Sequence, residues 1–242
     1  MLRPALFSAA GVVGGTWLFV SAFKKLRLRR AVQDTPLARV RSAALGRDEF
    51  AGRALPAAQP LRGPFSGLPC VWYRWKVEEE RRDSKGNVHW TTLGQGESFE
   101  AFALDDGTGS LRVEPRGAEV EPTDPLVYRT GGVLGDGLPP GPAAAEWASA
   151  GIFASRRRLS EWTVAPDTSV FAVGVLRSLA DPATGTELKV LMQGTQGEPF
   201  FISSRSRAEV ERELAWSVWL RMAGGALLAV ASAAVGMAAL GG

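Results

Sequence analysis

Two side chains of this sequence could form a nucleophile and its base, because the 242 residues contain one cysteine, Cys70, and one histidine, His89. A cysteine acts as a nucleophile when a base such as histidine lies within hydrogen-bond reach of its sulfur. The competing interpretation is that Cys70 is buried packing at the start of a strand, where its thiol is unreactive. The same counts exclude an internal disulfide and a zinc site with four Cys or His ligands in these residues. We therefore predict no catalytic site, no metal site and no cofactor.

A second candidate is the pair of carboxylates in the run DDGTG at residues 105–109. Adjacent aspartates could bind a metal ion or exchange protons, but a calcium loop needs spaced acidic ligands and a distal glutamate, which this run lacks. Asp and Gly instead supply the side-chain hydrogen bonds and positive φ angles of a tight hairpin. The run therefore predicts a turn between two short strands at Phe99–Leu104 and Ser110–Glu114.

The basic triplet Arg156-Arg157-Arg158 could bind a phosphate or a lipid headgroup, although such triplets more often form a solvated surface. The chain carries a formal net charge of +3, and most of it lies beside the two apolar ends. This distribution does not indicate a nucleic-acid surface, so we predict no nucleic-acid partner.

Each end of the chain carries a long apolar stretch. Residues 4–23 and 222–242 contain no charged side chain, and each is long enough to cross a bilayer core of about 30 Å as a helix. A cleaved signal peptide is the alternative for the first stretch, with Val20-Ser21-Ala22 as its cleavage site. The basic residues follow this stretch rather than precede it, which favours an uncleaved anchor. We therefore predict two transmembrane helices.

Basic residues beside both stretches predict the orientation of the chain. Arg205, Arg207, Arg212 and Arg221 lie before the second stretch, and the asymmetry of charge places the connecting domain in the cytoplasm. Arginine outnumbers lysine 23 to 5, which is typical of a GC-rich bacterial genome. Helical spans then predict the bacterial inner membrane. The basic residues after the first stretch are also expected to contact lipid headgroups: Lys24, Lys25, Arg27, Arg29 and Arg30.

Small residues recur at helical spacing in both stretches and predict closely packed helices. They are Gly11 and Gly15 in the first stretch, and Gly225, Ala229 and Ala233 in the second. The whole chain is rich in Ala and Gly, so chance could produce the same spacing. Packing of helices and self-association of the chain through these residues both stay open.

Strand patterns dominate the residues between the apolar ends. Asp34-Thr35-Pro36 predicts the start of a short helix that ends at Gly46. Alternating apolar residues then predict strands, and a polar turn at 83–87 predicts a hairpin. Besides the hairpin described above, the predicted strands lie at residues 71–77 and 88–93, on both sides of a turn at 165–167, and at 188–192.

The chain is expected to divide into three parts. Residues 1–30 form a transmembrane helix with a basic flank, and residues 31–204 form a β-rich domain. Residues 121–150 are a loose Gly- and Pro-rich connection, in which Trp147 packs on the domain or on the bilayer interface. Residues 205–242 form an amphipathic helix that continues into the second span. The predicted fold class is α+β, a mainly antiparallel sheet or small barrel-like domain flanked by two transmembrane helices.

Four blocks of sequence, in this order, resemble the GIDE domain, also described as a "beside a membrane" domain. They read TPLARVRSAALGRDEFAGRA, LRGPFSGLPCVWYRWKVEEE, FALDDGTGSLRVEPRGAEV and RRRLSEWTVAPDTSVFAVGVL. That domain occurs in mitochondrial outer-membrane ubiquitin ligases and in related bacterial membrane proteins, and the resemblance covers residues 34–204. It implies a set of family-motif or partner-binding positions: Pro69, Cys70, Asp106, Thr108, Gly109, Glu161 and Trp162.

The ligases of this family carry a zinc-binding RING after the second span. These 242 residues cannot form one, because they hold a single Cys and a single His. The resemblance therefore implies a non-catalytic module that binds or senses partners at the membrane surface, with the lipid bilayer and a protein as its partners. The alternative is a component of a ubiquitin-ligase-like system whose RING belongs to another chain.

Overall fold

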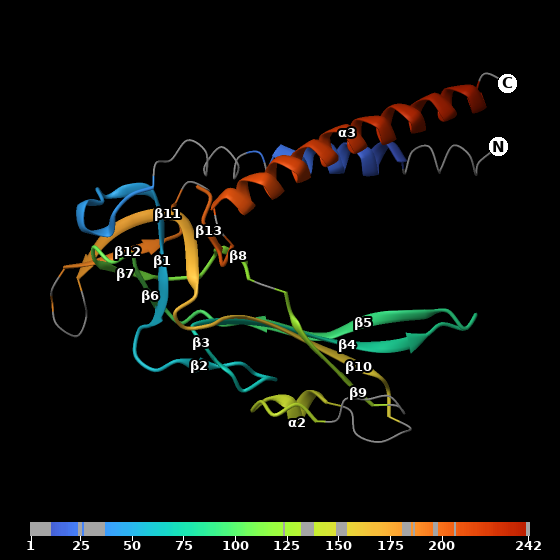
Figure 1. Ribbon diagram of the computed structural model, residues 1–242. Coiled ribbons are helices and arrows are strands. Elements are labelled where there is room, and N and C mark those ends of the chain that lie inside the picture. The colour runs from blue at the N-terminus through green and yellow to red at the C-terminus, as the bar shows by residue number, and fades with distance from the viewer. Residues whose placement is uncertain are drawn as a thin grey trace. The chain divides into compact units, whose positions relative to one another are not determined.

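The computed structural model describes residues 11–23, 26, 37–122, 124–131, 138–148, 154–180, 185, 187–195, 198–205 and 207–240. The chain divides into two compact units (Figure 1). One unit is Leu37–Ser206 and is rich in strands. The other combines the two ends of the chain, Met1–Pro36 and Arg207–Gly242, and its described residues are helical.

The strand-rich unit begins with a short 3-10 helix, and the strands follow along the chain with one short α-helix between them. In order these elements are η1 (Val40–Ser42), β1 (Gly46–Pro56), β2 (Leu61–Arg62), β3 (Pro69–Cys70), β4 (Trp72–Arg82), β5 (Val88–Glu97), β6 (Phe102–Asp105), β7 (Ser110–Val113), β8 (Glu119–Glu121), β9 (Leu126–Thr130), α2 (Ala144–Trp147), β10 (Arg157–Val164), β11 (Ser169–Ala180), β12 (Glu187–Met192) and β13 (Phe201–Ser203).

Five strands close into a barrel in the order β1-β6-β7-β12-β11, because β11 also pairs with β1. Numbered by their order along the chain, the five barrel strands are β1, β6, β7, β11 and β12. Around the barrel they follow the order first, second, third, fifth, fourth, and the third and the fifth, β7 and β12, run parallel. This strand order is that of the five-stranded Greek-key barrel called the OB-fold. The strands β13 and β8 extend the sheet from β11.

The barrel interior is filled by apolar side chains that alternate along each strand. Phe50 of β1, Leu104 of β6 and Leu176 of β11 are fully buried members of this core. Val40 of η1 belongs to the same core, so the 3-10 helix packs on the barrel rather than standing apart from it.

A second sheet, in the order β5-β4-β10-β9, is built from segments inserted between the barrel strands. The hairpin of β4 and β5 forms part of this sheet, and α2 lies against one face of the sheet (Figure 1). That face holds a small core of Phe65, Val77 and Leu159, with Trp75 and Trp147 packed on it. Trp147 thus packs on the domain, which was one of the two predicted places for it.

The helical unit contains an apolar helix at Gly11–Phe23 and the helix α3 (Arg207–Leu240). Among the described residues, one segment, Trp216–Val235 of α3, is long and apolar enough to cross a membrane, and the helix Gly11–Phe23 is shorter. The helix α3 is continuous from Arg207 to Leu240 and includes most of the second apolar stretch. The N-terminal part of the first predicted span lies outside the described residues.

The predicted packing of small residues occurs between these two helices of the same chain. A Cβ atom added to Gly15 would lie 2.7 Å from the backbone oxygen of Gly225 and 2.7 Å from the backbone nitrogen of Ala229. A Cβ atom added to Gly225 would lie 2.8 Å from the oxygen of Gly15. The helix backbones therefore meet where neither residue has a side chain. Self-association through the same residues stays a prediction.

Three sequence-based expectations differ from the structure. The start expected for the short helix, Asp34-Thr35-Pro36, lies outside the described residues; from Leu37 to Gly46 the only helical segment is η1, because Ala38 donates a backbone hydrogen bond to the oxygen of Glu49 and the chain there is extended. The strand β1 was not predicted, since polar residues and Gly interrupt its apolar alternation. Residues 121–150, expected to be a loose connection, contain the strand β9, which pairs with β10.

Candidate functional site

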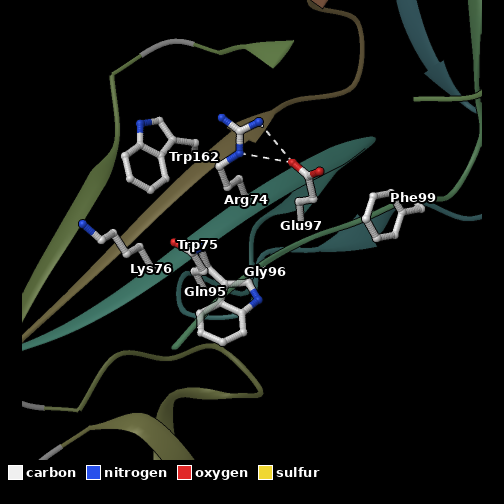
Figure 2. A pocket seen from close by; sticks show the side chains of 8 residues that line it. All are labelled: Arg74, Trp75, Lys76, Gln95, Gly96, Glu97, Phe99 and Trp162. Carbon is white, nitrogen blue, oxygen red and sulfur yellow. Dashed lines mark hydrogen bonds and ion pairs between the residues drawn. The ribbon is translucent and has the colours of Figure 1, made fainter. Parts of the chain in front are cut away.

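A partly open pocket lies on the four-stranded sheet beside its edge strand β5 (Figure 2). Its volume is about 490 Å³, which is within the usual range of ligand pockets. The residues that line it come from β4, β5, β10 and the segment after β5. They are Arg74, Trp75, Lys76, Gln95, Gly96, Glu97, Phe99 and Trp162.

The strand register brings the charged and aromatic parts of the pocket together. Arg74 of β4 is opposite Glu97 of β5 on one side and opposite Trp162 of β10 on the other. Directly opposite residues of an antiparallel pair share a face of the sheet, so these three side chains form a row. Figure 2 shows Arg74 and Glu97 in contact, with the ring of Trp162 to one side of them and the ring of Phe99 to the other.

The charged groups of the pocket already have partners. The Nε and Nη2 atoms of Arg74 donate hydrogen bonds of 3.2 and 3.1 Å to Glu97 Oε2, and its guanidinium carbon lies 5.1 Å from the ring centre of Trp72. Lys76 donates a hydrogen bond of 2.6 Å to Glu78. Because these charges are paired, the surface that the pocket offers to a partner is mainly its aromatic rings.

The position of Trp75 depends on a glycine of the edge strand. A Cβ atom at Gly96 would lie 2.8 Å from the Nε1 atom of Trp75, so the indole lies against bare backbone. The same ring packs edge-on to Phe65 at 6.0 Å and contacts the ring of Trp147 at 5.2 Å between centres. These contacts hold Trp75 in one orientation beside the pocket.

Phe99 forms the exposed rim of the pocket. Its side chain is 45% exposed, and the guanidinium carbon of Arg116 lies 4.7 Å from its ring centre. A large aromatic ring that is held in place but remains in contact with water is suited to binding an apolar group.

Glu161, a predicted motif position, organises a loop rather than facing solvent. Its side chain is buried, and its Oε2 atom accepts hydrogen bonds from the backbone N–H groups of Phe65 at 2.6 Å and Ser66 at 3.1 Å. Its Oε1 atom accepts a hydrogen bond from the Ser66 hydroxyl. A Cβ atom at Gly63 would collide with this carboxylate, so the loop can close only around a glycine. Within the second of the family blocks, the residues between β2 and β3 therefore form a loop folded around Glu161.

Cys70 and His89 are not brought together by the strand pairing. Cys70 in β3 pairs with Leu61, whereas His89 in β5 pairs with Arg81 and is exposed. Burial, assisted by the negative charge of Glu161, raises the pKa of the Cys70 thiol to about 12. A thiol with such a pKa is protonated at neutral pH and is a poor nucleophile.

The run at residues 105–109 is the turn between β6 and β7, as predicted, and it also holds η1. Asp106 Oδ1 accepts hydrogen bonds from the backbone and hydroxyl of Thr108 and from the backbone of Gly109. Asp106 Oδ2 accepts one of 2.9 Å from the backbone N–H of Val40. Burial alone would raise the pKa of Asp106, but these donors outweigh it and hold the pKa below its usual value.

The basic triplet faces a row of glutamates on the neighbouring strand. Arg157 donates to Glu79 at 3.2 Å and Arg158 donates to Glu78 at 2.6 Å. A third pair, between Arg156 and Glu80, has an N–O distance of 3.5 Å. We call these three ion pairs the charge ladder. Their carboxylates occupy the arginines, so the triplet is not a vacant phosphate site.

The pocket residues other than Trp162 were not among the predicted site positions. Two signals in the sequence could have found them. The strand pattern of Val71–Val77 already placed Arg74 and Lys76 on the face opposite Trp75. Gly94 and Gly96 interrupt the following strand, and a glycine within a strand often marks the close approach of another group. What the sequence could not give is the register that places Glu97 and Trp162 on either side of Arg74.

A comparison with protein-family models gives a match to the model described as "GIDE: E3 Ubiquitin ligase" over residues 75–236, more than half of the chain. The chain belongs to the GIDE family. This confirms the resemblance seen in the sequence blocks. Comparisons of the GIDE chain with curated proteins and with solved structures give no match.

The matched region begins within β4, at Trp75, and ends within α3, so it contains β5, β10 and every residue that lines the pocket except Arg74. Among the described residues of the GIDE chain, no group of three or more His, Cys, Asp or Glu side chains is placed to hold a metal ion. The predicted headgroup contacts lie outside the residues that the structure describes: Lys24, Lys25, Arg27, Arg29 and Arg30.

Proposed function

We propose that this GIDE chain is a membrane-anchored binding module whose pocket on the four-stranded sheet receives an apolar or aromatic side chain of a protein partner. The observation that carries the proposal is the composition of the pocket. Its rings, among them Trp162 and Phe99, are accessible, while Arg74 and Lys76 are paired with carboxylates. Rigid aromatic surface beside neutralised charge is suited to binding and supplies no obvious acid, base or nucleophile.

In this proposal the two apolar ends anchor the chain, with the strand-rich unit in the cytoplasm of a bacterial cell at the inner membrane. The apolar segment Trp216–Val235 supports the anchoring. The basic residues beside both apolar stretches support the orientation. The bound side chain would belong to a protein that reaches the same membrane surface.

Site-specific photo-crosslinking tests the proposal. A photoreactive amino acid replaces Gln95 at the pocket edge, and the cross-linked partner is identified from intact membranes by mass spectrometry. We expect one protein adduct that disappears in the Phe99→Ala/Trp162→Ala variant and persists in Trp90→Ala, which removes a ring from the same sheet outside the pocket lining. Only lipid adducts, or equal yields from all variants, would contradict the proposal.

A second candidate function is favoured by the description of the family model, which names a ubiquitin ligase. Here the chain would be the membrane-bound component of a ubiquitin-ligase-like complex, with a RING-type zinc protein supplied by another chain. Purification from native membranes, followed by zinc analysis and an assay of ubiquitin-type transfer, tests this candidate. An active complex without any zinc-binding subunit would eliminate it.

A further inference from the structure

We propose that one end of the barrel is a docking surface for a bilayer that contains anionic lipids. This surface, called here the basic rim, combines four arginines with two exposed leucines: Arg39, Arg41, Arg47, Arg177, Leu45 and Leu179. The basic rim is separate from the pocket. Of the proposed function, this inference depends only on the membrane anchoring.

Backbone pairing places these residues at one end of the barrel. Gly46 at the start of β1 pairs with Leu176 of β11, and Ser178 of β11 pairs with Lys189 of β12. Arg177 lies between those two positions of β11, and Leu179 follows directly after them. The start of β1, the end of β11 and the start of β12 therefore adjoin one another.

The 3-10 helix η1 is fixed to the same end. The Nζ atom of Lys189 donates hydrogen bonds to the carbonyl oxygens of Val40 at 2.9 Å, Ala43 at 3.3 Å and Arg41 at 3.5 Å. Thr108 accepts a hydrogen bond from the backbone N–H of Arg41 at 3.4 Å. Because the backbone of η1 is held in this way, Arg39 and Arg41 project from a fixed surface.

The arginines of the basic rim are available for binding. Arg39, Arg41 and Arg47 are exposed and Arg177 is half-buried, and within the described residues none of the four forms a side-chain ion pair or hydrogen bond. Among the described residues, three accessible carboxylates adjoin these segments, Asp48, Asp106 and Glu187, against the four arginines and Lys189, so positive charge prevails by five to three. The arginines of the charge ladder differ from those of the basic rim, because each of them forms an ion pair with a glutamate on the neighbouring strand.

The leucines of the rim indicate a lipid surface rather than a soluble anion. Leu45 is 62% exposed and Leu179 is 40% exposed, and neither contributes to the barrel core. Basic residues interleaved with exposed apolar ones match the interface of an anionic bilayer, where headgroup phosphates meet acyl chains. A free phosphate would leave the leucines in water.

Chain length keeps the basic rim near the bilayer. Residues 24–36 connect the apolar helix Gly11–Phe23 to Leu37, the first residue of the strand-rich unit. Fully extended, such a connection spans no more than about 50 Å. Arg39 and Arg41 follow Leu37 by two and four residues, so this connection limits their distance from an anchored helix, and docking costs less of the entropy that a free protein would lose on reaching a membrane.

Environment-sensitive fluorescence in proteoliposomes tests the basic rim. The full-length Leu45→Cys chain is labelled with an NBD dye, and Cys70 should not react because it is buried. The labelled chain is reconstituted in phosphatidylcholine alone or in phosphatidylcholine with phosphatidylglycerol. We expect a several-fold rise and a blue shift of emission only with phosphatidylglycerol, and loss of the rise in high salt.

Charge reversal supplies the matched controls. Arg39→Glu/Arg41→Glu should abolish the rise, whereas Arg82→Glu, which alters an exposed arginine on the β4–β5 hairpin, should leave it unchanged. A dye at Ser84 in the turn of that hairpin should report water in all vesicles. The inference is overturned if the dye at position 45 reports water in both lipids, responds equally to both, keeps its response after Arg39→Glu/Arg41→Glu, or matches the dye at position 84. Failure of the chain to float with the vesicles would instead refute the anchoring in the proposed function.

Discussion

Glu161 is a charged residue in a buried place, and its three hydrogen bonds explain why it can be there. A buried carboxylate is tolerated when donors satisfy its oxygens, and backbone N–H groups of Phe65 and Ser66 do so. The benefit is mutual, since the tight loop would otherwise bury these N–H groups without acceptors. The same residue precedes Trp162, which lines the pocket. Glu161 thus fixes the loop on one face of the sheet, while its neighbour Trp162 lines the pocket.

Replacing Glu161 tests this role. In Glu161→Gln, the amide NH₂ group cannot accept the hydrogen bond that the Ser66 hydroxyl donates, and the remaining oxygen lacks the charge that strengthens the two bonds from the backbone N–H groups of Phe65 and Ser66. We expect a loss of about 1–3 kcal/mol in the free energy of unfolding and faster reaction of Cys70 with a thiol reagent, measured in detergent by chemical denaturation and by thiol titration. The exposed Glu146→Gln on α2 is the control. An unchanged unfolding midpoint would show that the loop does not depend on this carboxylate.

Asp106 gives the fold a sensitivity to acid. Because its folded-state pKa is lowered, the stability that it contributes is complete above the ordinary aspartate pKa of about 3.9 and is lost as the pH falls through the lower folded value. We expect Asp106→Asn to unfold more easily at neutral pH and to lose less additional stability than the wild type on acidification. Unfolding midpoints measured at neutral and acidic pH test this, with the exposed Asp124→Asn as control. Parallel pH curves for wild type and Asp106→Asn would contradict it.

The charge ladder shows how two neighbouring elements hold their register. Arg157 is opposite Glu79 and Arg158 is opposite Glu78 in the pairing of β10 with β4. A shift of one residue would also turn each side chain to the other face, so the alternation of apolar residues supports the same register. Burial would raise the pKa of Glu78, but hydrogen bonds from Lys76 and Arg158 outweigh this and lower it.

A double-mutant cycle measures this element-scale coupling. Arg158→Glu places like charges opposite each other and should cost about 1–3 kcal/mol of stability. Adding Glu78→Arg restores opposite charges in reversed positions, and we expect the pair of changes to cost less than the sum of the single ones. Unfolding free energies of the wild type, the two single variants and the double variant give the coupling. Strict additivity would show that the ladder residues act independently.

The sequence predicted those elements whose patterns are local. The hairpins at 83–87 and 105–109 and the strands around residue 166 follow from turn residues and short apolar alternations, and the structure has them. The closure of the barrel could not be predicted, because β1 is mainly polar and its partner β11 is remote in the chain. Of the predicted positions, only Trp162 lines the pocket, since its other walls depend on a cross-strand register that the sequence leaves open.

At the scale of the whole molecule, the side of the membrane that the strand-rich unit faces decides where its partners are found. We expect a cysteine introduced at Ser84, in the exposed turn between β4 and β5, to resist a membrane-impermeant thiol reagent in intact cells and to react once the inner membrane is opened. Cys70→Ser removes the native thiol from the measurement. Labelling in intact cells, or after the outer membrane alone is made permeable, would place the unit in the envelope and contradict the orientation predicted from the basic residues.

The closed ring of strands also has a consequence for how the protein is made. Gly46 pairs with Leu176, 130 positions later in the chain, so β1 leaves the ribosome long before its partner exists. At about 5–20 residues per second, this wait lasts roughly 6–25 s. Such non-local pairing is also slow to form. In the anchoring proposed above, the helix Gly11–Phe23, which emerges ahead of every barrel strand, reaches the bilayer while the barrel is still open, and the strand-rich unit completes its folding already tethered there.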